Sequence, residues 1–346
     1  AAGGGAAGPP AVVAVAGSDV NGHGADGGLN GIIASPSSDE YYPAVAIAAL
    51  MRILRDPALS MHHSMVVYAV MVIFKSAGIK CVPFLPHITA PFMAVIRTCE
   101  PGLRDMMFQQ LAVLVSVVKQ HIRNYLPDLF ALIQEYWHHS SLLIHILSLV
   151  EELATALNDD FKPLLLELLS QMLSLLHTDR SERRQSTLKV LHALEVFGRS
   201  LDDYVHLVVP PLVRLFDSPD SGAMIPVRQA AMHTLARLST VLDLKDFASR
   251  ILHPLIRVLD LGPAELRRDV MDTLCALVPY LGNDFVVFLP MINKVMARHR
   301  VHHPRYKMLL DRLENSEPVH DVAGLPSDAA AAVAVAGAGA GASMDG

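Results

Sequence analysis

The stretch that decides the fold is "NDDFKPLLLELL", residues 158–169, because its arrangement returns three times further along the chain. In each copy an acidic residue precedes an aromatic residue, a proline follows, and an apolar run comes next. The later copies begin at Leu201 ("LDDYVHLVVPPLVRLF"), Leu244 ("LKDFASRILHPLIRVL") and Gly282 ("GNDFVVFLPMINKVM"). Recurrence at a nearly fixed period is the sequence signature of a repeat architecture.

The aromatic residue of each copy marks the phase of the repeat. Successive aromatic markers lie 36 to 43 residues apart, and a proline follows each within two to seven residues. A period near 40 residues is typical of helix-pair solenoids of the HEAT and armadillo type. The pattern predicts six full units and the start of a seventh, between Tyr41 and about Asn315. The markers are Tyr41, Phe84, Tyr125, Phe161, Tyr204, Phe247 and Phe285, and the prolines are Pro43, Pro86, Pro127, Pro163, Pro210, Pro254 and Pro290.

The content of one unit indicates two helices. Residues 226–242, "PVRQAAMHTLARLSTVL", place apolar residues at three to five residue steps, which predicts an amphipathic helix with one buried face. Residues 204–216, "YVHLVVPPLVRLF", are apolar on nearly every side, as expected for a helix between neighbouring repeats. No stretch alternates with period two, so the predicted fold class is all-α.

The acidic residues before the aromatic markers are predicted to be helix caps. A carboxylate at a helix start accepts unpaired backbone N–H groups and favours the positive end of the helix dipole, which is worth about 1 kcal/mol for each cap. The aromatic residue is then expected to pack at the joint with the preceding unit. This assigns an architectural role to Asp160, Asp203, Asp246 and Asp284.

The prolines are expected to act according to their position. Pro163 falls in the first turn of its helix, where its missing N–H costs little. Pro210, Pro211 and Pro254 fall later, where a proline removes a backbone hydrogen bond and kinks the helix at a cost of about 3 kcal/mol. Bent first helices are therefore predicted.

The composition excludes several classes of function. Charged residues make up 18% of the 346 residues and the net charge is −6, so a globally basic surface for nucleic acid is absent. Cys81, Cys99 and Cys275 have no Cys-x-x-Cys spacing, which indicates buried thiols in a reducing compartment and neither disulfides nor a zinc site. The longest apolar run, Ser64–Phe74, is shorter than the roughly 18 residues that a membrane span needs.

The two ends of the chain differ from the repeats. Residues 1–38 and 315–346 are rich in Ala, Gly, Ser and Pro and are predicted to be disordered tails around a solenoid at 39–314. The Gly-rich start has no Gly-Lys-Ser/Thr, so it does not indicate a phosphate-binding loop. A chain that opens on Ala, without a signal peptide, is expected to be a fragment. The last repeat lacks a clear second half, which predicts an exposed apolar end and partial aggregation in isolation.

The search for catalytic or metal-binding residues gives none. The acid pairs Asp159-Asp160 and Asp202-Asp203 recur at the same place in successive repeats. They are therefore interpreted as helix caps and not as an acid–base pair. The histidine pairs His62-His63, His138-His139 and His302-His303 have no acid or cysteine in the spacing of a closed zinc site. We therefore predict no catalytic, cofactor-binding or metal-binding residue, and no cofactor.

Of three further features, two allow two interpretations each. "RRQS", Arg183–Ser186, resembles a target of basophilic kinases but also fits a charged helix start. Trp137 is expected to end a helix without forming a stacking platform. The stretch from Lys294 to Arg312 is either a basic patch for an acidic partner or a solvated final helix pair. Its charges are Lys294, Arg298, Arg300, Arg305, Lys307 and Arg312, against Asp311 alone.

Several stretches carry a resemblance to a known family. "YYPAVAIAALMRILRDPALSMHHSMVV", "IFKSAGIKCVPFLP", "LDDYVHLVVPPLVRLFDSPD", "ASRILHPLIRVLD" and "FLPMINKVMARHRVHHPRY" resemble the middle HEAT-repeat region of the target of rapamycin (TOR) serine/threonine kinases, of the phosphatidylinositol-3-kinase-related group. The resemblance runs from about Glu40 to about Leu313. The tails do not match, and the stretch around Ser221 to Ile225 departs from the family.

The resemblance implies a non-catalytic scaffold in growth and nutrient signalling. In this family the region bridges the N-terminal solenoid to the catalytic half, supports pairing of two kinase copies, and contributes to the surface for Raptor-like subunits and an activating small GTPase. The kinase loops have no counterpart here, so the chain is expected not to be an enzyme. The expected location is the cytoplasm, with the nucleus and endomembranes reached through partners, and no nucleic acid or membrane span is expected.

Two alternatives remain beside this scaffold. An independent HEAT adaptor, such as a phosphatase scaffold or transport receptor, would share the fold. An unrecognised enzyme would need a concave pocket with convergent polar groups, for which the sequence offers no constellation.

Overall fold

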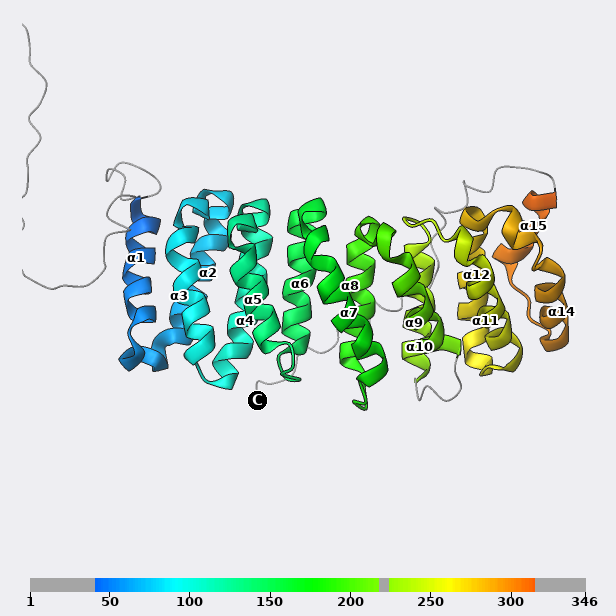
Figure 1. Ribbon diagram of the computed structural model, residues 1–346, viewed down its shortest axis with the longest axis horizontal. Coiled ribbons are helices and arrows are strands. Elements are labelled where there is room, and N and C mark those ends of the chain that lie inside the picture. The colour runs from blue at the N-terminus through cyan, green and yellow to red at the C-terminus, as the bar shows by residue number, and fades with distance from the viewer. Residues whose placement is uncertain (1–40, 218–223, 315–346) are drawn as a thin grey trace, which may run out of the picture.

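The computed structural model describes residues 41–217 and 224–314, which fold into seven helical hairpins stacked side by side (Figure 1). Within these residues every regular element is an α-helix or a short 3₁₀ turn, so the prediction of an all-α solenoid is confirmed. The predicted tails 1–38 and 315–346, and most of the Ser221–Ile225 stretch, lie outside the described residues.

Each hairpin pairs a first helix with a second helix. The first helices are α1 (Tyr41–Arg55), α3 (Leu85–Thr98), α5 (Leu126–Tyr136), α7 (Lys162–Thr178), α9 (Val205–Asp217), α11 (Ala248–Leu261) and α14 (Leu289–His299). The second helices are α2 (His63–Ala77), α4 (Pro101–Val118), α6 (Leu143–Leu157), α8 (Gln185–Phe197), α10 (Ile225–Leu238), α12 (Arg267–Leu281) and α15 (Pro304–Glu314). The seventh unit, predicted as only a start, therefore has a second helix, α15, which the histidine- and proline-containing turn before it obscured in the sequence.

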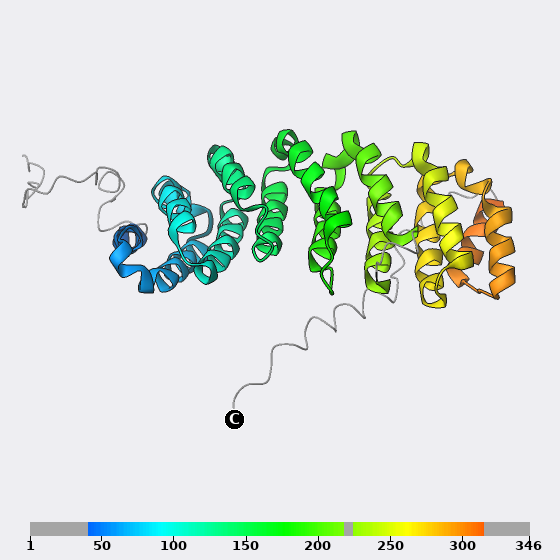
Figure 2. The ribbon, with the colours of Figure 1, turned by 60° about the horizontal axis from the view of Figure 1, so that its bottom comes forward.

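The hairpins form two layers. Each second helix packs on the second helix of the next hairpin, and first helices such as α9, α11 and α14 contact one another in the other layer. Figure 2 shows the resulting row, with α1 and α2 at one end and α14 and α15 at the other. Because each hairpin contacts mainly its neighbours, stability is carried by the hairpin cores and the interfaces between them.

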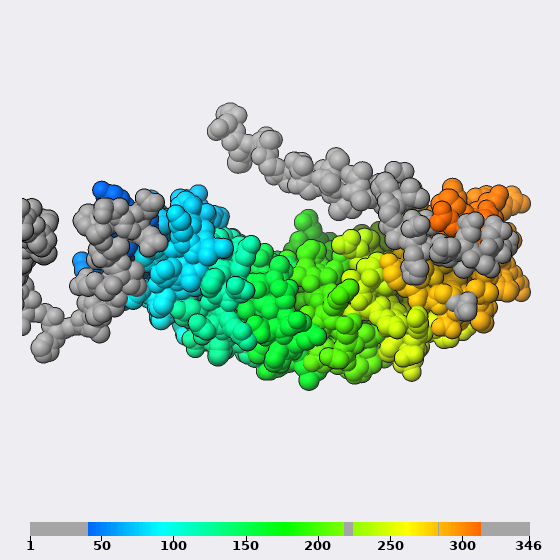
Figure 3. Space-filling model, turned by 90° about the horizontal axis from the view of Figure 1, so that it is seen from above, coloured from blue at the N-terminus to red at the C-terminus, as the bar shows by residue number. Residues whose placement is uncertain are grey.

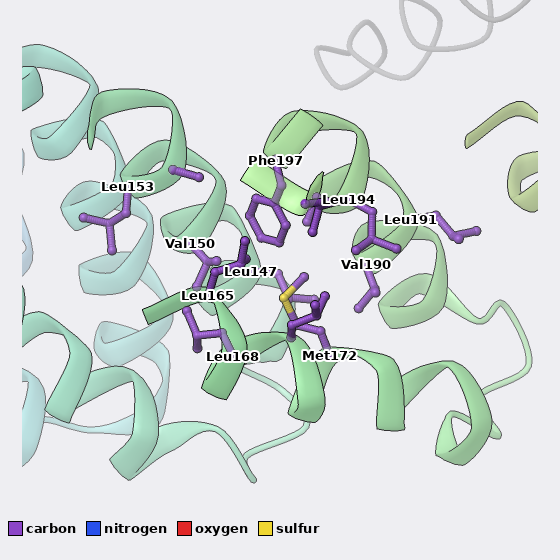
Figure 4. Packing of buried hydrophobic residues seen from close by; sticks show 14 of the residues in the cluster. Leu147, Val150, Leu153, Leu165, Leu168, Met172, Val190, Leu191, Leu194 and Phe197 are labelled. Carbon is purple, nitrogen blue, oxygen red and sulfur yellow. The ribbon is translucent and has the colours of Figure 1, made fainter. Parts of the chain in front are cut away.

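One continuous apolar core runs through the stack. Near its middle, aliphatic side chains from α6, α7 and α8 pack together, and Val150, Leu168 and Leu194 are fully buried there (Figure 4). The predicted buried face of residues 226–242 is confirmed by Val227, Ala231 and Leu235. That helix ends at Leu238, because a turn follows there.

The aromatic markers occupy equivalent places, as the period predicted. Five of the seven close the short 3₁₀ turn that joins a second helix to the next first helix, while Tyr41 begins α1. These turns are η2 (Gly78–Phe84), η3 (Lys119–Tyr125), η4 (Asn158–Phe161), η5 (Gly198–Tyr204) and η7 (Lys245–Phe247), while Phe285 lies in the one-turn helix α13 (Asn283–Val286). Phe161 is 1% exposed, and its ring centroid lies 5.7 Å from that of Phe197 in α8. Its turn η4 also contacts α6 of the preceding hairpin, in line with the expected position at the joint between two units.

The prolines lie where the sequence placed them. Pro163 is in the first turn of α7, and Pro210, Pro211 and Pro254 are inside α9 and α11. The α-helices α9 and α11 continue through Pro210, Pro211 and Pro254.

The same turns share a feature that the sequence did not suggest. Five second helices end on a residue with positive φ, and at each of them ψ lies between −114° and −132°, a conformation that favours glycine. Three of the five are glycines and two carry side chains. They are Gly78, Gly198 and Gly282, and Lys119 (φ 51°) and Asn158 (φ 48°).

Replacing Lys119 by glycine should therefore stabilise the protein. Relief of backbone strain, worth about 1–3 kcal/mol, should outweigh the roughly 0.5–1 kcal/mol entropic cost of a glycine, so we expect a net gain of about 1 kcal/mol in the free energy of unfolding, measured by chemical denaturation. Gly198→Ala should have the opposite effect, although a Cβ there would meet nothing within 4 Å. Lys75→Gly, inside α2, is the control and should destabilise. A loss of stability in Lys119→Gly would contradict the strain argument.

The structure also bears on the expectations for the cysteines and for a membrane span. All three cysteines are free thiols; Cys81 and Cys275 are buried, as predicted, whereas Cys99 is only half-buried. One stretch, Pro57–Thr98, is apolar and long enough to pass a length-and-composition test for a membrane span. In the structure it is broken at Gly78 into α2 of 15 residues and α3 of 14 residues, each shorter than the roughly 20 residues that a spanning helix needs.

Candidate functional site

Asp160, Asp246 and Asp284 do not cap the first helices α7, α11 and α14, so the prediction is wrong for these three acids. The residues that immediately precede α7, α11 and α14 are Phe161, Phe247 and Phe288, and none makes a side-chain capping hydrogen bond. The acids lie one or more residues earlier, inside the short turns, because each turn is itself helical and displaces the start of the α-helix. Asp160 instead pairs with Arg123 of the preceding turn at 2.9 Å.

One carboxylate does accept a hydrogen bond from a backbone N–H in the first turn of a helix. It lies in a turn within a hairpin, at the other edge of the solenoid from the aromatic markers. Asp179, in the turn within the fourth hairpin, accepts hydrogen bonds from the backbone N–H and the hydroxyl of Thr187 in α8, at 3.0 and 2.9 Å. Asp179 also accepts hydrogen bonds from the backbone N–H and the hydroxyl of Ser181. Although burial acts to raise the pKa of Asp179, these hydrogen bonds hold it below its usual value.

Polar side chains join successive hairpins along both layers. Their partners are 31 to 41 residues apart, so each contact links one repeat to the next. Between second helices the pairs are Gln109–His145, Glu151–Lys189, Glu151–His192, Glu195–His233, Glu195–Thr234 and Gln229–Asp269, with Asp272–His303 before α15. Between first helices they are Arg97–Glu135, Gln134–Glu167, Gln134–Gln171, Asp217–Arg257, Asp260–Arg298 and Asp260–His299. We call this set the inter-repeat ladder.

Glu151 is the most buried carboxylate of the inter-repeat ladder. Its side chain is 11% exposed. It accepts a hydrogen bond from Lys189 Nζ at 2.6 Å and pairs with His192 Nδ1 at 2.9 Å. Both partners come from α8, whereas Glu151 lies in the middle of α6 among leucines. A buried charge is tolerated only when it is paired, so this contact fixes how the third and fourth hairpins meet.

Two further carboxylates of the ladder have lowered pKa values. Burial acts to raise the pKa of Glu195, but hydrogen bonds from His233 and Thr234 outweigh it and lower the pKa. Hydrogen bonds from His299 and then Arg298 lower the pKa of Asp260. Both groups are therefore held ionised, as contacts between repeats require. Sequence reasoning missed the ladder, although acidic residues within apolar second helices, such as Glu151, were a signal.

The histidine pairs do not form a metal site in the described residues, where no group of three or more His, Cys, Asp or Glu side chains converges. His63 is buried and its Nε2 lies 3.1 Å from the carbonyl oxygen of Asp56. His303 is 12% exposed and pairs with Asp272 at 3.0 Å. These two histidines are thus structural, while His62, His138, His139 and His302 are exposed.

One cluster has the residue types of a nucleophilic site. Cys275 Sγ lies 3.7 Å from His303 Nδ1, and His303 Nε2 lies 3.0 Å from Asp272 Oδ1. The cysteine is fully buried, however, and this burial raises its thiol pKa to about 12. A buried thiol held protonated cannot attack a substrate, so the cluster anchors α15 to α12.

The hollows of the surface lie between successive turns. One hollow, between the first two hairpins, has a volume of about 1080 Å³ and is lined mainly by apolar residues, including Leu54, Met61, Val95, Leu103 and Met106. A second, of about 470 Å³, lies beside Trp137, which follows α5 as predicted and is 5% exposed. Neither combines paired titratable groups with a strongly shifted pKa, as a reaction site would.

The basic stretch is not a uniform patch. Arg298 is neutralised by Asp260 at 2.6 Å, and Arg305 has a buried Nε without a hydrogen-bond partner. Lys294, Arg300 and Lys307 are exposed. The "RRQS" stretch marks the start of α8 at Gln185, which fits a charged helix start.

Comparison with known proteins agrees with the sequence resemblance. The family model described as "Serine/threonine-protein kinase mTOR domain" matches residues 18–119, so the match begins ahead of Glu40, where the sequence analysis had placed it. The Drosophila melanogaster serine/threonine-protein kinase mTor is 46% identical over 289 residues, which cover 83% of this chain and 12% of that protein. The Saccharomyces cerevisiae kinase TOR2 is 41% identical over 283 residues, 82% of this chain and 11% of that protein.

The solved structure of importin beta is similar in fold alone. It superposes with a TM-score of 0.53 at 13% identity, and the match covers 79% of this chain and 38% of that chain.

The chain spans about an eighth of the length of the curated kinases that it matches. That portion is a helical-repeat region without the kinase catalytic domain.

Proposed function

This chain is a HEAT-repeat region of the TOR serine/threonine kinase family, and from that premise we propose that it is a scaffold that holds other parts of such a kinase at a fixed separation. The scaffold bridges an N-terminal solenoid to the catalytic half and supports the pairing of two kinase copies. Raptor-like regulatory subunits and an activating small GTPase are proposed partners, on the strength of the resemblance. The cytoplasm is the proposed location.

The inter-repeat ladder is the observation that carries the proposal. A bridge must transmit position from one end to the other, and a stack of hairpins joined only by apolar contacts can slide and bend. Directional polar contacts, including the buried Glu151–Lys189 pair, fix the register between neighbouring hairpins along most of the described stack. Figure 3 shows the described hairpins packed side by side in one continuous row. The importin-like fold alone does not favour the independent-adaptor alternative, because its sequence identity is only 13%.

A chimeric kinase tests the scaffold proposal. Residues 41–314 of this chain would replace the matched segment of Saccharomyces cerevisiae TOR2, and the purified chimera would be assayed for phosphotransfer and for mass by light scattering. We expect activity and a two-copy mass close to those of the parent. A matched chimera carrying importin beta hairpins of the same length should lose both, because its surfaces differ. A kinase that retains both properties with the segment deleted would refute the scaffold role.

A further inference from the structure

The two strained residues that end second helices line the same hollow of the surface. Of the five second helices that end on a residue with positive φ, three end on glycine, whereas α4 and α6 end on Lys119 and Asn158. Both of these residues line a hollow of about 440 Å³. Because backbone strain of this kind gathers at sites where a particular side chain is needed, the coincidence points to a binding site.

The hollow belongs to the interior of the stack. Its walls come from the last turns of α4 and α6, from the start of η3 and from Ile79 in η2. Further hairpins follow on both sides, because α2 packs on α4 and α8 packs on α6. The hollow is therefore formed by neighbouring repeats and not by an uncovered end of the solenoid.

The hollow contains a cation and a carboxylate that do not neutralise each other. Lys119 and Glu152 both line it, and neither side chain forms a hydrogen bond or an ion pair with another described residue. In contrast, the neighbouring Glu151 is paired with Lys189 and His192. Two opposite charges that stay apart within one hollow are complementary to a ligand that carries both charges itself.

The other walls suit a small ligand with a hydrocarbon body. Ile79, Val118 and Ala156 are apolar, and Ile79 is 59% exposed. Gln120 and Asn158 add side-chain amides that make no hydrogen bond with another described residue. The volume lies within the range of small-molecule sites, roughly 300–1,000 Å³. A carboxylate, an ammonium group and a short hydrocarbon chain in one molecule are the chemistry of an aliphatic α-amino acid.

We propose that this hollow binds a small zwitterion of the aliphatic α-amino acid class. Lys119 Nζ binds the carboxylate of the ligand, Glu152 binds its ammonium group, and Ile79 and Ala156 contact its hydrocarbon chain. This role accounts for a strained lysine at a position where a glycine would be more stable. The inference does not rest on the scaffold proposal, because a rigid stack does not require the hollow to be filled.

Calorimetric titration of the full chain with valine tests the proposal. We expect saturable binding of valine. N-acetylvaline lacks the ammonium charge and valinamide lacks the carboxylate, so each should bind at least about tenfold more weakly through the loss of one charged contact. The free amino acid glycine should also bind more weakly than valine, because it buries less hydrocarbon.

Variants at residue 119 separate binding from folding. Lys119→Gln should weaken valine binding at least about tenfold. Lys119→Gly should do the same while the protein becomes more stable, so that unfolding cannot explain the loss. Glu152→Gln should weaken the binding of valine but not that of N-acetylvaline. Lys307→Gln is the matched control, because Lys307 is an exposed lysine of α15, and it should bind valine as the parent chain does.

Three results would overturn the proposal. Absence of saturable valine binding in the millimolar range would mean that the two charges are only solvated. Equal affinity for valine and N-acetylvaline would indicate a simple anion site. Equal affinity of Lys119→Gln and Lys307→Gln for valine would place the binding elsewhere on the chain.

Discussion

Replacing Phe161 by alanine should lower the free energy of unfolding by about 3–5 kcal/mol, the largest effect that we expect from a single change in this protein. Phe161 is among the largest fully buried side chains and lies where the turn η4, its own helix α7 and Phe197 of α8 meet. Alanine would leave a cavity that the surrounding leucines cannot fill without moving the backbone. The loss should appear in chemical denaturation followed by circular dichroism.

The position of the destabilised hairpins tests the Phe161→Ala prediction as well as the loss in free energy of unfolding does. Because the hairpins contact mainly their neighbours, hydrogen exchange should rise in the third and fourth hairpins and stay low in the sixth. Leu166→Ala is the matched control, because Leu166 lies in α7 and is 50% exposed, and its cost should stay below about 1 kcal/mol. Equal losses in the two variants would mean that the aromatic marker is not a core residue.

Replacing Lys189 by methionine should cost about 3 kcal/mol, far more than the loss of a surface ion pair. Methionine keeps most of the aliphatic stem of lysine but leaves the buried Glu151 carboxylate with His192 as its remaining side-chain partner. Removing one member of a buried pair is costly because the other charge stays desolvated. Chemical denaturation should show the loss as a lower midpoint.

A double-mutant comparison separates this effect from packing. Glu151→Gln combined with Lys189→Met removes the unpaired charge and should recover most of the lost stability. Arg97→Met is the exposed control, because Arg97 and Glu135 are 44% and 43% exposed, and it should cost no more than about 1 kcal/mol. If Lys189→Met and Arg97→Met lose the same stability, Glu151 does not act as a buried junction.

The candidate surfaces could be foreseen from the sequence only in part. The basic stretch was visible as a run of charges, but its neutralisation at Arg298 depends on Asp260, 38 residues away. Likewise His303 looked isolated, because Asp272 and Cys275 meet it only across the interface of α12 and α15. Contacts between repeats join residues that no local pattern connects.

The sequence by itself determined the architecture of this protein. A period near 40 residues, with an aromatic residue and a proline in each unit, requires stacked helical hairpins, because a single hairpin cannot bury its own apolar face. Phe84, Phe161 and Phe247 close equivalent turns for that reason. The tertiary structure alone decided the roles of the charged residues. Asp160 pairs across a turn and Glu151 joins two hairpins, since the energy of a charge depends on its burial and on which opposite charge the stack brings within about 3 Å.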